Sequence, residues 1–203
     1  ANDGWKDKVT TVSYFARVNY GFDNRYLLTA TMRADGSSKF AKGNKWGYFP
    51  SVALAWRANQ EAFLRDVTWL NNLKLRAGYG QVGNSNVDPY SYGATMFNVP
   101  TPMGSAWVQN NLSNPELKWE ASEQFNVGID FAALNNRIEL TVDGYYKQTK
   151  DLLLKVVAPS YTGITSDWGY IQAPYANIGQ VRNVGVEVAL NTRNIVTRDF
   201  TWS

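Results

Sequence analysis

Two amino acids are missing from this chain of 203 residues, which contains neither cysteine nor histidine. Without cysteine there are no disulfides, no thiolate metal ligands and no thiol nucleophile. Without histidine the chain lacks the usual general base of hydrolases and the commonest ligand of transition metals. Ordinary Ser-His-Asp chemistry and zinc chemistry are therefore excluded. We predict a protein that is not an enzyme, with no catalytic residue, no metal site and no cofactor.

Long hydrophobic runs and clusters of charge are also missing. No segment approaches the roughly 18 consecutive apolar residues of a membrane helix, and the apolar run at residues 152–154 ends at Lys155. This excludes a helical membrane protein. The net charge is +3, but the basic residues are scattered along the chain, whereas a nucleic-acid surface would cluster them. We therefore predict no nucleic-acid partner.

The chain does have an alternation of apolar and polar residues that covers most of its length. Residues 138–147 read Ile-Glu-Leu-Thr-Val-Asp-Gly-Tyr-Tyr-Lys, so one face of an extended strand would be apolar and the other polar. The aromatic content is high, with 12 Tyr, 9 Phe and 8 Trp. The pattern predicts an all-β protein whose sheet is apolar on one side and wetted on the other.

The alternation predicts seven strands and the start of an eighth. Their expected ranges are residues 10–20, 26–35, 46–57, 70–81, 118–132, 138–150 and 180–191, with the eighth from Asp199 onward. Short connections at 21–25, 133–137 and 192–198 fall on one end of the sheet, and long ones at 82–117 and 151–179 fall on the other. Outer-membrane barrels have this asymmetry of short periplasmic turns and long extracellular loops.

The remaining two connections lie at 36–45 and 58–69. The one at 58–69 lies on the short-turn side but is long enough for one or two helical turns, with Asn59 as a cap and with Phe63 and Leu64 buried. The strand ending near Asp35 is expected to close in a tight turn, with Gly36 free to adopt a positive φ.

The predicted strands assign each side chain to a face. The following residues form an apolar face that would contact lipid: Val18, Leu28, Ala30, Met32, Val52, Leu54, Leu75, Ala77, Val127, Ile129, Leu140, Val142, Val186 and Val188. The opposite, polar face carries Arg17, Asn19, Thr31, Arg33, Lys74, Arg76, Asn126, Asp130, Glu139, Asp143 and Glu187.

Aromatic residues gather near the expected strand ends, where barrels carry belts at both membrane interfaces: Tyr14, Tyr20, Tyr26, Trp46, Tyr48, Trp56, Tyr79, Trp119, Phe131 and Tyr146. A soluble β-sandwich would also alternate. Strand length, loop asymmetry and the aromatic positions favour an antiparallel transmembrane β-barrel.

Five sequence segments resemble those of a known protein family. They are Tyr26-Leu-Leu-Thr-Ala-Thr-Met-Arg-Ala-Asp-Gly-Ser-Ser-Lys-Phe40, Trp46-Gly-Tyr-Phe-Pro-Ser-Val-Ala-Leu-Ala-Trp56, Leu73-Lys-Leu-Arg-Ala-Gly-Tyr-Gly-Gln-Val-Gly-Asn84, Asn114-Pro-Glu-Leu-Lys-Trp-Glu120 and Asn177-Ile-Gly-Gln-Val-Arg-Asn-Val-Gly-Val-Glu187. In content, order and spacing they resemble the barrel of the SusC/RagA family of TonB-dependent outer-membrane transporters.

The resemblance implies a barrel of roughly 22 strands with a plugged lumen. This chain would supply about a third of that barrel. It contains neither a plug nor the N-terminal TonB box, the segment that TonB binds. We expect residues 1–203 to be a partial barrel domain, an excerpt from the middle of a longer protein.

The implied function is active import of a nutrient, an oligosaccharide or a peptide, across the outer membrane of a Gram-negative cell. The implied partners are a SusD-like surface lipoprotein, the TonB energising complex acting through parts outside this chain, and outer-membrane lipids. An alternative is a small self-contained barrel of eight strands, acting as an adhesin or a structural protein.

Three groups of residues are candidate sites. Flat rings among hydrogen-bonding side chains suit sugars or peptide backbones, so the long loops offer ligand candidates at Tyr92, Trp107, Tyr161, Trp168 and Tyr170. Plug-facing candidates on the polar face are Arg33, Arg76, Asp130, Asp143 and Glu187; the alternative is a solvated or mutually paired barrel wall. Asn84, Asn86 and Asp88 begin a calcium-loop pattern that fails at its later positions, so we expect a plain turn cluster.

Overall fold

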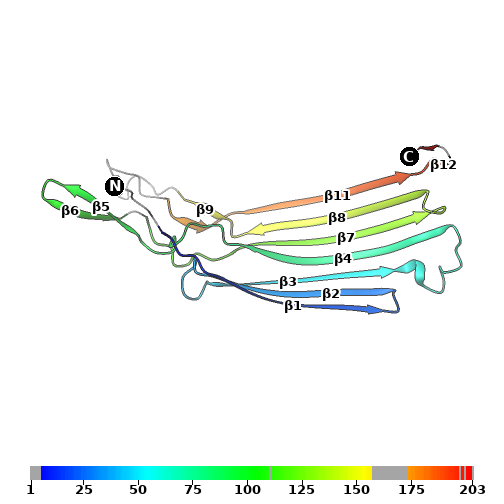
Figure 1. Ribbon diagram of the computed structural model, residues 1–203, viewed down its shortest axis with the longest axis horizontal. Coiled ribbons are helices and arrows are strands. Elements are labelled where there is room, and N and C mark those ends of the chain that lie inside the picture. The colour runs from blue at the N-terminus through cyan, green and yellow to red at the C-terminus, as the bar shows by residue number, and fades with distance from the viewer. Residues whose placement is uncertain (1–5, 110, 157–172, 197, 199, 203) are drawn as a thin grey trace.

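The computed structural model describes residues 6–109, 111–156, 173–196, 198 and 200–202. Its main element is one antiparallel sheet of seven long strands in the order β1-β2-β3-β4-β7-β8-β11 (Figure 1). These strands are β1 (Thr11–Phe22), β2 (Tyr26–Ser37), β3 (Trp46–Arg57), β4 (Leu70–Asn84), β7 (Glu120–Ala133), β8 (Ile138–Lys150) and β11 (Gln180–Thr192). Each pairs with the next long strand along the chain, so the sheet is an open up-and-down meander.

The seven predicted strands are confirmed. β3 and β8 match the expected ranges at both ends, and the other five differ only at their ends. Each contains 12 to 15 residues, more than the roughly 9 to 11 that a tilted strand needs to cross a membrane. The eighth segment differs: β13 (Thr201–Trp202) pairs with β12 (Ile195–Val196) as a separate two-stranded sheet rather than with the long strands.

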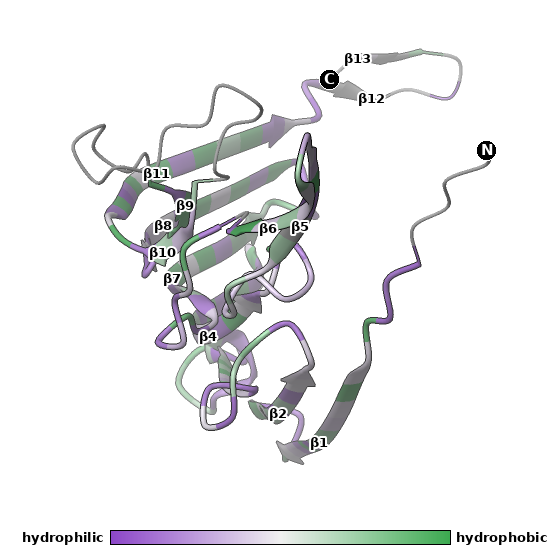
Figure 2. Cartoon of the chain, turned by 90° about the vertical axis from the view of Figure 1, so that its left-hand side faces the viewer, coloured by the Kyte–Doolittle hydropathy of each residue, from purple (hydrophilic) through white to green (hydrophobic). Residues whose placement is uncertain are grey.

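The strand register places the predicted apolar and polar residues on opposite faces. One row across the sheet joins Leu28, Leu54, Ala77 and Val127, and continues through Gly144 to Val186. Hydrophobic and hydrophilic residues accordingly alternate along the strands in Figure 2.

The apolar face is bare in the described part of the chain: Val186, for example, is 71% exposed. A sandwich would bury this face under a second sheet. The exposed face of the described strands therefore does not fit a sandwich.

Aromatic rings form a belt at each end of the apolar face. At the short-turn end Tyr26 stacks on Trp56 with ring centroids 6.5 Å apart and planes 2° apart. At the loop end Tyr14 stacks on Trp46, 6.0 Å away. Trp46 reaches Tyr14 by lying over Gly36, which stays within β2. The prediction of a positive φ at Gly36 is therefore wrong. Glycine suits this position because the absence of a side chain leaves room for the Trp46 ring.

A small hydrophobic core lies under the long loops. Phe40, Val87 and Leu117 are buried in it, and the partly buried residues that pack against it are Tyr92, Trp119, Leu153 and Tyr175. Trp119 was expected in an aromatic belt, but its ring instead contacts Phe40, with centroids 5.4 Å apart. Residues from the β2–β3 connection and from both long connections therefore form one packed unit.

Those connections also contain short strands that the sequence pattern did not predict. β5 (Met96–Thr101) and β6 (Gly104–Gln109) form a hairpin that projects from the loop end of the sheet (Figure 1). β9 (Leu153–Lys155) pairs with β10 (Tyr175–Asn177). Pro102 and Met103 connect β5 to β6, with Gly104 at φ +122° just after them. A turn of that kind, with Pro and then Gly between two short extended runs, was the signal for the hairpin.

The connection at 58–69 is less helical and less buried than expected. It contains one 3₁₀ turn, η1 (Ala58–Gln60), whose N-cap is Arg57 rather than Asn59. Asn59 instead donates a hydrogen bond from Nδ2 to the carbonyl oxygen of Asn71 at 3.2 Å. Leu64 is half-buried, but Phe63 is exposed, contrary to the prediction. Among the described residues, no helix is long and apolar enough to cross a membrane.

Candidate functional site

An ion-pair network on the polar face brings together three of the five plug-facing candidates. Arg76 on β4 donates from Nε and Nη2 to the two carboxylate oxygens of Asp130 on β7, each at 2.9 Å. Its Nη2 also lies 2.9 Å from Asp143 Oδ1 on β8. One guanidinium thus links three neighbouring strands, and the forked geometry suits a carboxylate well.

Gly128 makes this network possible. In the strand register it stands between Arg76 and Asp143, directly opposite both. A Cβ at this position would overlap Asp143 Oδ1 and lie 2.8 Å from Arg76 Nη2. The guanidinium therefore crosses β7 over a glycine, because any larger side chain would occupy the space of the ion pair. Sequence reasoning missed Gly128, since its role depends on the register of two neighbouring strands.

The other two plug-facing candidates lie apart from this network. Arg33 pairs with Asp35 on its own strand, with Nε 2.7 Å from Oδ2. Glu187 on β11 stands opposite Asp143 in the register, and in the described part of the chain it belongs to no ion pair. Arg76 therefore faces two carboxylates, with a third acid beside them, and Lys74 stands opposite Asp130 in the register. Acidic and basic side chains thus both occupy this part of the face.

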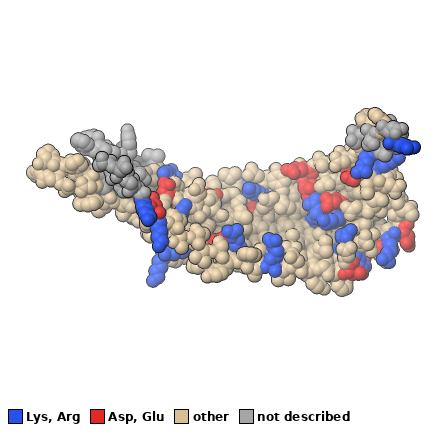
Figure 3. Space-filling view, in the orientation of Figure 1, with Lys and Arg blue, Asp and Glu red and all other residues tan. Residues whose placement is uncertain are grey.

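Small residues hollow the polar face next to the network. One shallow hollow of about 410 Å³ is lined by both the ion pair and small residues, among them Ala53, Gly78, Gly128 and Asp143. A neighbouring hollow of about 350 Å³ continues along Ser51 and Gly80 toward Lys147. On the face seen in Figure 3, acidic and basic side chains form small mixed groups, and large uncharged areas lie between these groups. These hollows can accommodate a polypeptide segment or a solute, and most of the residues that line them are uncharged.

The ligand candidates in the loops have different surroundings. Tyr92 is half-buried against the loop core, whereas Trp107 is exposed on β6. Tyr161, Trp168 and Tyr170 lie outside the described residues. Of the two described rings, Tyr92 thus belongs to the loop core and Trp107 to the exposed hairpin.

Asp88 and its neighbours serve loop packing. The Lys155 ammonium lies 3.1 Å from Asp88 Oδ2, and Tyr175 donates to the same oxygen at 3.3 Å. Asn84 Oδ1 accepts a hydrogen bond from the backbone N–H of Asn86 at 3.0 Å, as in an ordinary Asx turn. In the described part of the chain, no three His, Cys, Asp or Glu residues are grouped so that they could hold a metal.

Asn177 is the first residue of the segment 177–187, the last of the five segments that resemble the family. Its side chain joins two loops. Its Oδ1 accepts from the Lys118 N–H at 2.8 Å, and its Nδ2 donates to the carbonyl oxygens of Lys118 at 2.8 Å and Asp151 at 3.0 Å. This one amide therefore fixes the start of β7 against the segment that follows β8. Sequence reasoning did not assign a role to this residue.

Comparison with known proteins identifies similar chains. The family model described as "TonB dependent receptor-like, beta-barrel" matches residues 1–203. The TonB-dependent receptor SusC of Bacteroides thetaiotaomicron is 43% identical over 202 residues, covering 95% of this chain and 19% of that protein. The TonB-dependent receptor P3 of Formosa agariphila is 42% identical over 196 residues, again covering 95% and 19%. The chain thus spans about a fifth of the length of these relatives.

Solved structures give the same result at the level of the fold. The structure of the RagAB peptide transporter aligns with a TM-score of 0.81 at 31% identity, covering 94% of this chain and 20% of that one. The siderophore receptor PirA from Pseudomonas aeruginosa aligns with a TM-score of 0.59 at 14% identity, covering 90% and 31%. At that identity the likeness to PirA concerns the fold alone.

Proposed function

Because the chain belongs to the family of TonB dependent receptor-like β-barrels, we propose that its seven long strands form part of the wall of an outer-membrane transporter that imports a nutrient with energy delivered through TonB. The observation that carries the proposal is the two-faced sheet. An apolar face that nothing in the described chain covers suits lipid, and a polar face with ion pairs suits a wetted lumen. The relatives are receptors and transporters rather than enzymes.

Residues 1–203 are, in this proposal, one part of a larger barrel domain whose plug and TonB contacts are supplied by other segments. Two observations support it. The chain spans about a fifth of its relatives, and among the described residues its sheet is open, with β1 and β11 as its two edges. The open sheet also argues against the small self-contained barrel, which would have to close on itself.

The polar face is the proposed contact surface for a plug. Arg76 is paired with Asp130 and Asp143 through Nε and Nη2, so this part of the network is a mutually paired wall. Glu187 and the exposed guanidinium of Arg33 retain more capacity to bind a neighbouring segment. A plug would therefore contact these two residues before it competes for Arg76.

The loop end is the proposed region of ligand capture, together with a SusD-like surface lipoprotein. Trp107 and the tip of the β5–β6 hairpin extend beyond the packed loop core and are free of it. The ligand is an oligosaccharide or a peptide; the likeness to a peptide transporter supports the second, and exposed aromatic rings suit both.

The first experiment is the intact mass of the native polypeptide recovered from the outer membrane. A mass several times 22.8 kDa is expected for the transporter. A mass near 22.8 kDa would contradict it and favour the small barrel.

Uptake then tests the mechanism. Cells carrying the full-length protein are given labelled oligosaccharides and labelled peptides, with and without a functional TonB. Uptake of one of these classes is expected to require both the protein and TonB. Uptake that persists undiminished without TonB would refute the energised mechanism.

A further inference from the structure

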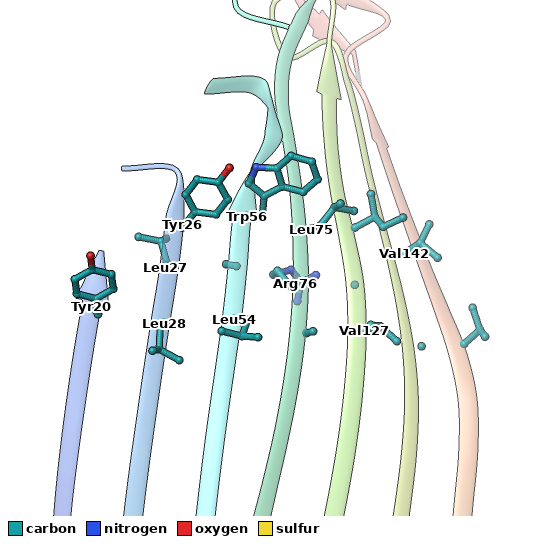
Figure 4. A pocket seen from close by; sticks show the side chains of 16 residues that line it. Tyr20, Tyr26, Leu27, Leu28, Leu54, Trp56, Leu75, Arg76, Val127 and Val142 are labelled. Carbon is teal, nitrogen blue, oxygen red and sulfur yellow. The ribbon is translucent and has the colours of Figure 1, made fainter. Parts of the chain in front are cut away.

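The connection between β3 and β4 folds toward the apolar side of the sheet. Its acidic residue Glu61 accepts hydrogen bonds on Oε1 from Tyr26 Oη at 2.6 Å and from Trp56 Nε1 at 3.0 Å. Both donors belong to the apolar face, where their rings lie side by side (Figure 4). The other oxygen of Glu61 accepts from Arg25 Nη1 at 2.9 Å. The Glu61 side chain is only 12% exposed, so these contacts fix the connection in position.

The far end of the same connection also lies on the apolar side. The ring of Trp69 lies 6.4 Å from that of Phe131, a residue of the apolar face. The carbonyl oxygen of Trp69 accepts a hydrogen bond from the Leu134 N–H at 2.8 Å, which joins the connection to the β7–β8 turn. The connection is thus attached to the apolar side at both ends.

Between these attachments the chain is compact and presents bare aromatic rings. Glu61 O accepts hydrogen bonds from the N–H groups of Leu64 at 3.0 Å and Arg65 at 2.9 Å, so the segment is turned on itself rather than extended. Phe63 is 71% exposed and Trp69 is 54% exposed. Arg65 and Asp66 beside them are exposed charges. Large exposed rings that are continuous with a membrane belt mark a contact surface rather than ordinary loop.

We propose that residues 58–69 form a membrane-interface anchor, in which Phe63 and Trp69 enter the boundary between headgroups and acyl chains of the periplasmic leaflet. The partner is the phospholipid surface itself. Glu61 fixes the direction of the anchor by binding the belt residues Tyr26 and Trp56, and Arg65 and Asp66 remain among the headgroups. This inference rests on the proposed barrel, because it requires the apolar face to be in lipid.

The chain contains no cysteine, so single cysteines can report on depth. In the full-length protein, freed of any cysteine elsewhere, three labelled variants are compared: Phe63→Cys, Val186→Cys at the middle of β11, and Met103→Cys at the hairpin tip, where Met103 is 96% exposed. Each carries a nitrobenzoxadiazole fluorophore in phosphatidylethanolamine–phosphatidylglycerol vesicles. The quenchers are lipids with a shallow or a deep nitroxide, and aqueous cobalt.

The label at 63 is expected to be quenched most by the shallow nitroxide, the label at 186 by the deep one, and the label at 103 by cobalt. If 186 is in lipid while 63 is quenched by cobalt as strongly as 103, the anchor is refuted and the barrel stands. If 186 is itself reached by cobalt, the barrel is refuted. Protection of 63 from both kinds of quencher would mean that protein covers it, and would also refute the anchor.

A second pair of variants tests the role of Glu61. Glu61→Ala removes the acceptor of Tyr26 and Trp56, and it is expected to raise cobalt quenching at position 63 severalfold. Asp66→Ala, which removes an exposed carboxylate from the same connection, is the matched control and should leave the quenching unchanged. Equal responses of the two variants would contradict the orienting role.

Discussion

The two faces of the sheet obey different rules. On the apolar face, neighbours such as Leu54, Ala77 and Val127 have only to be apolar, because fluid lipid accommodates their shapes. On the polar face, Arg76 needs Asp130, Asp143 and the gap at Gly128 in particular places. The choice of residues on the apolar face therefore depends on their free energy of transfer from water to lipid. The choice on the polar face depends on the geometry of particular contacts. Single substitutions should separate these two kinds of specification.

The largest expected effect comes from placing a charge on the apolar face. Val186→Arg, near the middle of β11, should lower the free energy of unfolding by about 2 to 4 kcal/mol, because a guanidinium near the bilayer midplane loses its hydration. Urea unfolding of the full-length barrel in vesicles measures it. Glu187→Gln, one residue away on the polar face, is the control and should cost less than about 0.5 kcal/mol. Equal losses would mean that the assignment of residues to the lipid-facing and polar faces is wrong.

A methyl group should suffice to disturb the polar face. Gly128→Ala places a Cβ in the space of the Arg76–Asp143 pair, and overpacking of this kind costs about 1 to 3 kcal/mol. Gly78→Ala is the matched control, because its nearest atom would be Val52 O at a comfortable 3.8 Å. Unfolding in urea should therefore detect a loss for the first variant only. A loss of the same size for Gly78→Ala would show a general cost of side chains on this face.

The two ion pairs of Arg76 should be unequal. Asp130 receives two hydrogen bonds and Asp143 shares one nitrogen, so double-mutant cycles with Arg76→Gln should give the larger coupling for Asp130→Asn. Because all three side chains are partly exposed, we expect about 0.5 to 1 kcal/mol for Asp130 and less for Asp143. A larger coupling to Asp143 would reverse the assignment.

The smallest expected effect concerns Glu61, the carboxylate beside the apolar face. Hydrogen bonds from Tyr26 and Trp56, with Arg25 nearby, lower the pKa of Glu61. Its contribution to stability is thus complete above the ordinary glutamate pKa of about 4.3 and is lost as the pH falls through the lowered value. The stability difference between the native protein and Glu61→Gln should therefore shrink on acidification. A difference that is independent of pH from 7 to 3 would contradict this linkage.

The sequence predicted what depends on alternation. The ends of β3 and β8 and the division of residues between the two faces follow from a period of two bounded by turn residues. Burial of Phe63 was predicted wrongly because a loop aromatic was assumed to need a protein core. Gly36 was predicted wrongly and Gly128 was missed for one shared reason: each makes room for a side chain from a neighbouring strand, which no local pattern reveals.

The candidate site was predicted in part. Arg76, Asp130 and Asp143 were placed on one face by alternation, but their joining through one guanidinium depends on the β4–β7 and β7–β8 registers. The aromatic loop residues could be identified by type alone. Whether a ring such as Tyr92 packs inward depends on the loop core, which forms from three segments far apart in sequence.

That loop core has a consequence for how the sheet assembles. Hairpins such as β1–β2 and β7–β8 have short turns, so their strands meet at little entropic expense. β4 and β7, and likewise β8 and β11, are separated by far longer connections, so bringing these two pairs together is entropically more costly. Val87 near the start of the β4–β7 connection and Leu117 near its end are both buried with Phe40. Leu153 and Tyr175, near the ends of the β8–β11 connection, pack against the same core. The loop core thus holds together the ends of both long connections and offsets part of the cost of closing them.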